Sequence, residues 1–146
     1  MYFVDRSKIE EILLYMEKIL AEVTNHSNKS FVGKLALERM AHVLIESIID
    51  VGNMMIDGFI MRDPGSYEDI IDILVDERVL PKEESNRYKE IIGLRKKIVT
   101  NYSEIEHYKL EKSFMDHKQM LEDFSGHIRS YLENELGVAN AFSNEK

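Results

Sequence analysis

A chain of 146 residues predicts one domain, residues 1–146, that is long enough to bury a sizeable core. The composition, 44% hydrophobic and 32% charged, excludes wholesale disorder. The lack of cysteine excludes disulfides, thiolate metal sites and a cysteine nucleophile, and it favours a reducing cytoplasm. The formal net charge of −8 argues against a protein that holds nucleic acid mainly by attraction to phosphate. A nucleic-acid role would therefore need a local basic site or specific chemistry.

The first 23 residues predict an amphipathic helix that begins at Asp5 or Ser7. Ser7 and Glu10 fit a capping box, in which each side chain caps a backbone N–H. Apolar residues recur with the 3.6-residue period of a helix that buries one face. They are Ile9, Ile12, Leu13, Met16, Ile19, Leu20 and Val23. The polar residues 24–28 then predict a turn.

A second, long helix is predicted from about Ser30 to about Asp57. Its apolar seam consists of Leu37, Leu44, Ile48, Val51 and Met55. The most apolar stretch of the chain, residues 43–61, is interrupted by Glu46, Asp50 and Asp57. Because a membrane-spanning helix needs about 20 mostly apolar residues, we expect no membrane span here.

The clearest break in the chain is at residues 62–65, since Pro-Gly favours a turn and stops a helix. Ser66 and Asp69 then predict the capped start of a short third helix. Pro81 fits the first turn of a fourth helix, where its missing N–H is harmless, and this helix is predicted to run to about Tyr102.

A fifth helix is predicted from between Ile105 and Leu110 to about Leu136, with Gly137 as its stop and a flexible tail beyond. Its seam alternates steps of four and three residues, which is typical of helices packed at a shallow angle. The seam consists of Leu110, Phe114, His117, Leu121, Phe124, Ile128 and Tyr131. No segment predicts a strand. The expected fold is all-α, an up-and-down bundle of four main helices plus one short helix, with a core at about residues 5–136.

The fourth predicted helix places one charged residue on its apolar face. Tyr88, Ile92, Val99 and Tyr102 recur there in steps of four and three, and Arg95 falls in line with them. An unpaired buried charge is very costly, so Arg95 must reach solvent at the bundle edge, form an ion pair, or line an anion site. The pattern leaves these three interpretations open.

The second helix offers partners for this arginine. A polar stripe runs along it, made of Arg39, Glu46, Asp50, Asn53 and Asp57. One interpretation is a solvated outer face. The other is that Glu46 or Asp50 holds the Arg95 guanidinium and orients it, with Asn53 as a further polar residue of the same stripe.

The histidines do not indicate a metal centre. His117 falls in the fifth-helix seam and is more typical of a core residue than of a ligand. His42 follows Glu38 at four residues, and His107 follows Glu104 at three. The Glu-x-x-His spacing of di-iron bundles is needed twice on facing helices, and it occurs once here, so we expect no metal site and no cofactor.

Several segments together resemble a known family. They are residues 35–39 (LALER), 44–50 (LIESIID), 63–67 (DPGSY), 73–74 (IL) and 93–102 (GLRKKIVTNY). They are similar to segments of the HepT-like proteins, a family also called domain of unknown function 86, within the HEPN group. The resemblance spans about residues 5–135 and is strongest to a Gram-positive branch. It implies a HEPN-type helical bundle.

The signature of that family is Arg, four residues, His, one residue, Tyr. Arg95 and Tyr102 match it, whereas Thr100 stands at the histidine position. The resemblance implies that Arg and His line a cleft at a homodimer interface and cleave RNA without metal. The arginine would stabilise the phosphate, and the histidine would act as general base or acid toward the ribose 2′-hydroxyl. A threonine hydroxyl does not titrate near neutral pH, and loss of general acid–base catalysis typically costs about 10²–10⁴-fold in rate.

The resemblance implies a second role for the tyrosine. In the family, a minimal nucleotidyltransferase antitoxin adds AMP to it and silences the toxin. Tyr102 could be that acceptor, since a bulky negative chain beside Arg95 would block an RNA cleft. A packed aromatic side chain at the same position is the alternative.

Two functions therefore follow. The first is a HepT-like ribonuclease toxin that acts as a homodimer through Arg95, with a nucleotidyltransferase partner that modifies Tyr102. The second is a non-catalytic dimeric bundle that binds a nucleotide, RNA or a protein, which Thr100 and the net charge of −8 favour. His107 offers the first function a substitute for the motif histidine if a turn folds it back toward Arg95.

Overall fold

The computed structural model describes residues 4–23 and 29–143, with side chains as far as Glu135. Its regular elements are all helical, which confirms the predicted all-α class. They follow in the order α1 (Arg6–Val23), α2 (Phe31–Gly58), α3 (Tyr67–Asp76), the 3₁₀ helix η1 (Lys82–Glu84), α4 (Ser85–Gly93), α5 (Arg95–Thr100), α6 (His107–Asp116) and α7 (Lys118–Ser143). The predicted turn at 24–28 lies outside the described residues.

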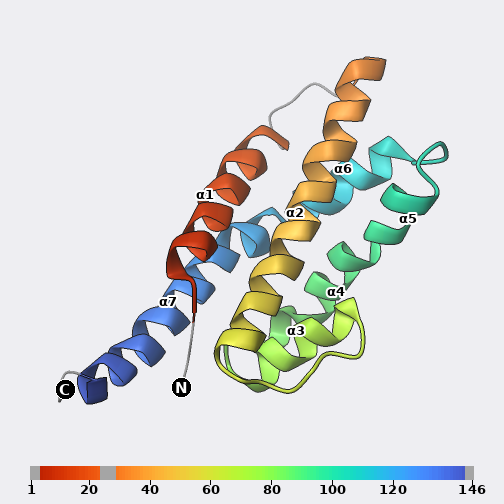
Figure 1. The fold of residues 1–146 in the computed structure, drawn as a ribbon. Helices are drawn as coiled ribbons and strands as arrows, with labels where there is room; N and C mark the ends of the chain where they lie inside the picture. Colours follow the sequence, from red (N-terminus) through yellow and green to blue (C-terminus); the bar gives the residue numbers. More distant parts are fainter. Residues whose placement is uncertain (1–3, 24–28, 144–146) are drawn as a thin grey trace.

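The long helices alternate in direction (Figure 1). α1 and α2 run side by side in opposite directions, α4 and α5 return beside α2, and α6 with α7 runs back to the C-terminus. α3 crosses the end of α2. This arrangement places α5 beside the middle of α2, where the polar stripe of the sequence lies.

Short polar side chains cap the starts of three helices, and two of them, Asp5 and Ser66, were predicted as caps. The Ser30 hydroxyl accepts a hydrogen bond from the Gly33 N–H (2.9 Å), and the Ser66 hydroxyl accepts one from the Asp69 N–H (3.0 Å). At α1 the cap is Asp5, whose carboxylate accepts from the Lys8 N–H (3.0 Å). The alternative capping box at Ser7 is wrong, because Glu10 instead binds Arg129 of α7.

The fourth predicted helix is broken at Leu94, which is a correction to the expected continuous rod. The Leu94 N–H bonds to the Ile91 carbonyl three residues back instead of four (3.1 Å), which tightens the turn between α4 and α5. Gly93 precedes the break, and glycine weakens a helix because its backbone is the most flexible. α5 then ends at Thr100, two residues before the predicted end at Tyr102.

The fifth predicted helix also divides, at His117, and extends further than expected. His117 leaves helical geometry at φ −108° and ψ 17°, and its ring contacts Glu90 of α4. Phe114 before the bend and Leu121 after it both stay buried, as the seam predicts. The stop at Gly137 is wrong, since the backbone of α7 continues to Ser143. A helical glycine costs only about 1 kcal/mol relative to alanine, so it does not by itself end a helix.

The core lies where the apolar seams of α1, α2, α4 and α6–α7 meet. The predicted seam of α2 is fully enclosed, with Leu37, Leu44, Ile48, Val51 and Met55 each 0% exposed. α3 packs closely on α2 at Gly52, where an added Cβ would lie 2.5 Å from Ile70 Cγ2. In the described part of the chain, no helix is long and apolar enough to cross a membrane.

The turn before α3 supplies a pH-dependent contribution to stability. The Asp69 carboxylate accepts two hydrogen bonds from Arg62 (2.7 and 2.9 Å) and one from the Gly65 N–H (2.9 Å), which together lower its pKa to about 2. The ordinary value is 3.8, so this stabilisation is complete above about pH 4 and is lost as the pH falls toward 2. We expect Asp69→Asn to unfold at lower urea concentration than wild type at pH 6, with the difference shrinking between pH 4 and pH 2 and vanishing below pH 2. A difference that stays constant with pH would contradict this assignment.

Candidate active site

Arg95 forms an ion pair with Glu46, which joins α5 to the middle of α2. The Arg95 Nε lies 2.5 Å from Glu46 Oε1, and the two side chains are 27% and 33% exposed. The hydrogen bond to Glu46 raises the pKa of Arg95, so the guanidinium stays charged. Of the interpretations left open by the sequence, the structure shows the ion pair, and its acceptor is Glu46.

A second neighbour holds Arg95 from another side. The guanidinium carbon lies 4.7 Å from the centre of the Tyr67 ring, at the start of α3, in a cation–π contact. The Arg95 Nε donates a hydrogen bond to Glu46, whereas neither Nη1 nor Nη2 makes a hydrogen bond to a described residue. A guanidinium carries five N–H donors in a fixed plane, so the two terminal nitrogens are oriented and available to an anion.

His42 lies at the same carboxylate, one turn before Glu46 on α2. Its Nε2 is 3.5 Å from Glu46 Oε1, the oxygen that also contacts Arg95. The His42 side chain is 29% exposed, close to the values for Glu46 and Arg95. The site thus combines a fixed cation, a carboxylate and an accessible imidazole.

The other predicted members of the polar stripe do not contact Arg95. Asp50 lies one turn beyond Glu46, and burial together with the charge of Glu46 raises its pKa. Asn53 is half-buried one turn further along α2. Neither forms a hydrogen bond or ion pair with Arg95.

Thr100 and Tyr102 both lie on the surface at the end of α5. The Thr100 hydroxyl donates a hydrogen bond to the Lys96 carbonyl (2.6 Å), which closes the last turn of the helix. Tyr102 follows in the connection to α6 and is 70% exposed. The expectation that Tyr102 shares the buried face of a continuous helix is therefore wrong, and so is the alternative of a packed aromatic.

His107 does not reach Arg95. Its Nε2 lies 2.6 Å from Glu38 Oε2, two turns before Glu46 on α2. This long-range pair fixes the start of α6 against α2. Within the described residues, no group of three or more His, Asp or Glu side chains could hold a metal ion.

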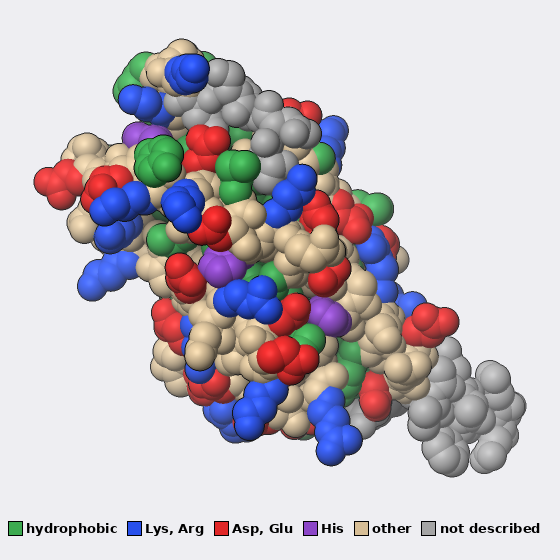
Figure 2. All heavy atoms as spheres, turned by 180° about the vertical axis from the view of Figure 1, so that it is seen from behind, with side chains coloured by type: hydrophobic (Ala, Val, Ile, Leu, Met, Phe, Trp, Pro, Cys, Tyr) green, Lys and Arg blue, Asp and Glu red, His purple; other side chains and the backbone are tan. Residues whose placement is uncertain are grey.

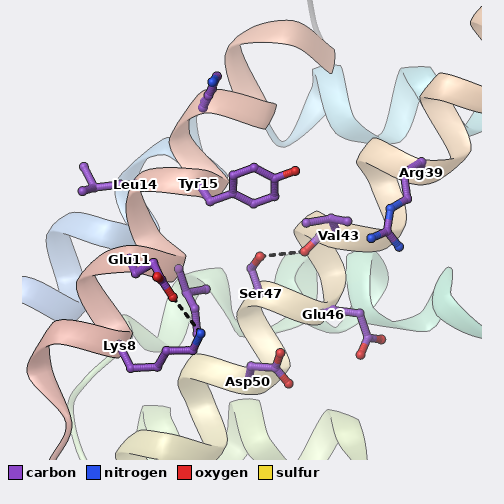
Figure 3. Close-up of a pocket in the computed structure, with 11 residues that line it drawn as sticks. Lys8, Glu11, Leu14, Tyr15, Arg39, Val43, Glu46, Ser47 and Asp50 are labelled. Atoms are coloured by element: carbon purple, nitrogen blue, oxygen red, sulfur yellow. Dashed lines mark hydrogen bonds and ion pairs between the residues drawn. The ribbon is translucent and has the colours of Figure 1, made fainter.

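A groove of about 820 Å³ lies between α1 and α2, and Glu46 is one of the residues that line it. Figure 3 shows Arg39, Glu46 and Asp50 projecting from α2, and the Tyr15 ring extending from α1 toward α2. Lys8 and Lys18 also line the groove. The groove therefore offers cations and one exposed aromatic ring next to the Arg95 site.

The charges on the surface are mixed. On the face shown in Figure 2, the described acidic and basic side chains are interleaved, and they form no broad basic area. This agrees with the formal net charge of −8. An anion site on this chain would have to rely on local groups such as Arg95, because long-range attraction to a polyanion is weak for such a surface.

Sequence reasoning missed two residues of this site. The four-residue spacing of His42 and Glu46 on one helix was visible and would have shown that they share a face. Tyr67 had no comparable signal, since its contact with Arg95 depends on how α3 crosses α2.

The described helices, together with Arg95, Thr100 and Tyr102 in motif spacing, define a HEPN-like helical bundle. Residues 8–128 match the family model described as ribonuclease HepT-like. That match covers most of the chain, and the chain belongs to the HepT-like ribonuclease family. It is 51% identical over 143 residues to YutE of Bacillus subtilis (strain 168), a protein named as a provisional RNase. The alignment covers 97% of this chain and 99% of YutE.

Solved structures agree with this assignment. The structure of the cytosolic protein YutE from Bacillus subtilis has a TM-score of 0.91, covering 94% of this chain and 96% of YutE. A mutant of the MntA-HpeT toxin–antitoxin pair has a TM-score of 0.74 at 16% identity, covering 84% of this chain and 98% of that one. The tri-AMPylated HEPN toxin of Shewanella oneidensis in complex with its MNT antitoxin has a TM-score of 0.68 at 18% identity, covering 82% and 97%. The last two resemblances establish the fold alone.

Proposed function

We propose that this protein is a metal-independent endoribonuclease of a toxin–antitoxin pair, in which Arg95 binds the scissile phosphate. The observation that supports this most strongly is the fixed guanidinium. Glu46 and Tyr67 hold Arg95 in place while its Nη1 and Nη2 make no hydrogen bond to a described residue. Such donors can stabilise the charge that develops on a phosphate in the transition state without reorganising.

The chemistry expected of this site is attack by the ribose 2′-hydroxyl on the adjacent phosphate. The terminal nitrogens of Arg95 would hydrogen-bond to the non-bridging phosphate oxygens. Thr100 cannot act as the proton acceptor, because its hydroxyl does not titrate near neutral pH and already donates to the Lys96 carbonyl. The proton must therefore leave to another group or to water.

We further assign Tyr102 as the acceptor of AMP from a nucleotidyltransferase antitoxin in the cytoplasm. Its side chain is 70% exposed in the connection after α5, which satisfies the access that a modifying enzyme needs. The Shewanella oneidensis relative is described as AMPylated and in complex with an MNT antitoxin. An added AMP group on Tyr102 would bring bulk and negative charge to the end of α5, where we expect it to compete with RNA for the site.

The active form in this proposal is a homodimer, with two copies of Arg95 in a shared groove. The alternative is a dimeric bundle without catalysis that binds a nucleotide, RNA or a protein partner. Thr100 favours that alternative, since the family histidine is replaced and the hydroxyl that replaces it is engaged with the backbone.

The proposal is tested by incubating labelled RNA with the protein in excess EDTA. We expect wild type to cut RNA and leave 2′,3′-cyclic phosphate ends, and Thr100→His to cut faster, because a second proton-transfer group then follows Arg95 at motif spacing. Co-expression with the nucleotidyltransferase should add AMP masses to wild type and none to Tyr102→Phe. If wild type and Thr100→His are both inert toward RNA, the nuclease is excluded. Retained binding of short RNA or AMP would then support the alternative.

A further inference from the structure

We propose that His42 is the general base of this ribonuclease and replaces the motif histidine that is absent at position 100. This inference rests on the proposed RNA cleavage. The family motif places its histidine on the same segment as the arginine. Here the imidazole belongs to His42 of α2, the helix that also carries Glu46, the ion-pair partner of Arg95.

The geometry of one carboxylate oxygen carries the inference. Glu46 Oε1 lies 2.5 Å from Arg95 Nε and 3.5 Å from His42 Nε2. Because both distances end on the same atom, the distance between Arg95 Nε and His42 Nε2 cannot exceed the sum of these two distances. A phosphate bound to Arg95 and the 2′-hydroxyl next to it extend over a comparable span. The imidazole and the guanidinium therefore lie beside each other on one carboxylate, where we expect a single nucleotide to contact both.

The other described histidines are engaged elsewhere. His107 contacts Glu38 at 2.6 Å, His117 contacts Glu90 at 3.0 Å, and His127 faces Glu84 at 3.4 Å. Glu90 and Glu84 belong to α4 and η1, and no carboxylate of these pairs touches Arg95. Among the described residues, His42 alone shares a carboxylate with the proposed phosphate-binding group.

The exposure of the three side chains fits contact with substrate. His42, Glu46 and Arg95 are 29%, 33% and 27% exposed, so each is fixed by packing and still reachable from solvent. Glu46 is an acceptor with two oxygens and can face both cations at once. It would stabilise the imidazolium that forms when His42 takes a proton, as a carboxylate does beside a catalytic histidine.

The proposed step balances as follows. The His42 nitrogen that carries no hydrogen takes the proton of the 2′-hydroxyl while the 2′-oxygen forms a bond to phosphorus. The bond from phosphorus to the 5′-oxygen breaks, and that oxygen leaves with its electron pair and takes a proton from water. The products are a 2′,3′-cyclic phosphate and a 5′-hydroxyl. The His42 imidazolium then returns its proton to solvent.

The experiment compares RNA cleavage in EDTA by wild type, His42→Ala and His42→Gln, with and without added imidazole. We expect both variants to cleave at least about 10²-fold more slowly, the lower end of what general acid–base catalysis contributes. Imidazole in the buffer should restore part of the activity of His42→Ala, because it can enter the space left by the side chain. It should not restore Arg95→Ala, which lacks the phosphate ligand and retains its base.

The matched control is His127→Ala. His127 is 31% exposed and lies 3.4 Å from a glutamate, so it resembles His42 in exposure and pairing but lies on α7. We expect its cleavage rate to equal that of wild type. Melting temperatures of all variants separate loss of folding from loss of catalysis.

Each other outcome decides against the inference. Wild-type rates in both His42 variants would overturn it and leave the proposed function standing. A loss in folded His42→Ala that imidazole does not restore would exclude proton transfer by His42. A loss in His107→Ala that imidazole restores would assign the base to His107 instead. An inert wild type would overturn the inference together with the proposed function.

Discussion

Replacing Arg95 with alanine should lower kcat/KM for RNA cleavage by about 10²–10³-fold, the loss typical when one preorganised donor to a developing oxyanion is removed. The reason is that Arg95 combines a permanent charge with a fixed direction. The hydrogen bond to Glu46 keeps its pKa raised, and the Tyr67 ring supports the guanidinium plane. The measurement is the initial rate of cleavage of a short labelled RNA at several substrate concentrations.

Two further variants separate charge from geometry. Lys96→Ala removes the neighbouring exposed cation of α5 and is expected to change KM only slightly, since a single exposed charge contributes little. Arg95→Lys keeps the charge but cannot bond Glu46 and a phosphate in one plane, so its rate should remain close to that of Arg95→Ala. If Arg95→Lys retained wild-type rates, the oriented guanidinium would not be the catalytic feature.

The largest effect on stability from a single added methyl group is expected at Gly52. Alanine there would place Cβ 2.5 Å from Ile70 Cγ2 and 3.5 Å from Leu74 Cδ1, at the contact of α2 with α3. Ile70 is β-branched and has one strongly preferred rotamer in a helix, so it cannot easily move aside. Overpacking typically costs about 1–3 kcal/mol, and we expect Gly52→Ala to lower the free energy of unfolding within that range. Urea denaturation measures it.

Gly126 provides the matched control for that substitution. It is exposed on α7, and nothing lies within 4 Å of an added Cβ. Gly126→Ala should therefore raise the free energy of unfolding by about 0.5–1 kcal/mol, because alanine is the better helix former. Effects of the same sign at the two glycines would contradict the close packing of α2 on α3.

Sequence periodicity predicted the helical elements well where a single buried face determined them. α2 begins at Phe31, next to the predicted start at about Ser30, and its apolar seam is buried throughout. The breaks at Leu94 and His117 leave the hydrophobic period almost unchanged. Each of the two broken helices was therefore predicted as one continuous helix. Their interruption depends on local backbone geometry and on contacts such as that of His117 with Glu90, which periodicity does not report.

The candidate site was predictable in part for the same reason. An arginine on an apolar seam left an ion pair as one of three interpretations, and the polar stripe of α2 contained the partner that the structure shows, Glu46. The position of Tyr102 was mispredicted because α5 ends two residues earlier than the pattern indicated. The contact of the Tyr67 ring with Arg95 depends on how α3 crosses α2. The order of residues in the sequence does not predict that crossing.

The break at Leu94 leaves Arg95 and Thr100 on a separate helix of six residues, Arg95–Thr100, of which only Ile98 is buried. So short a helix has little stability of its own, because nucleation costs more than one turn of hydrogen bonds returns. Its amide hydrogens should therefore exchange with solvent faster than those of α4, as a local opening that does not require the bundle to unfold. An anion that draws Arg95 away from Glu46 would remove one of the contacts that fix this segment, which leads into the connection that carries Tyr102. If Tyr102 is the AMP acceptor proposed above, nucleotide addition there and anion binding at Arg95 would therefore each change the local order of the same segment.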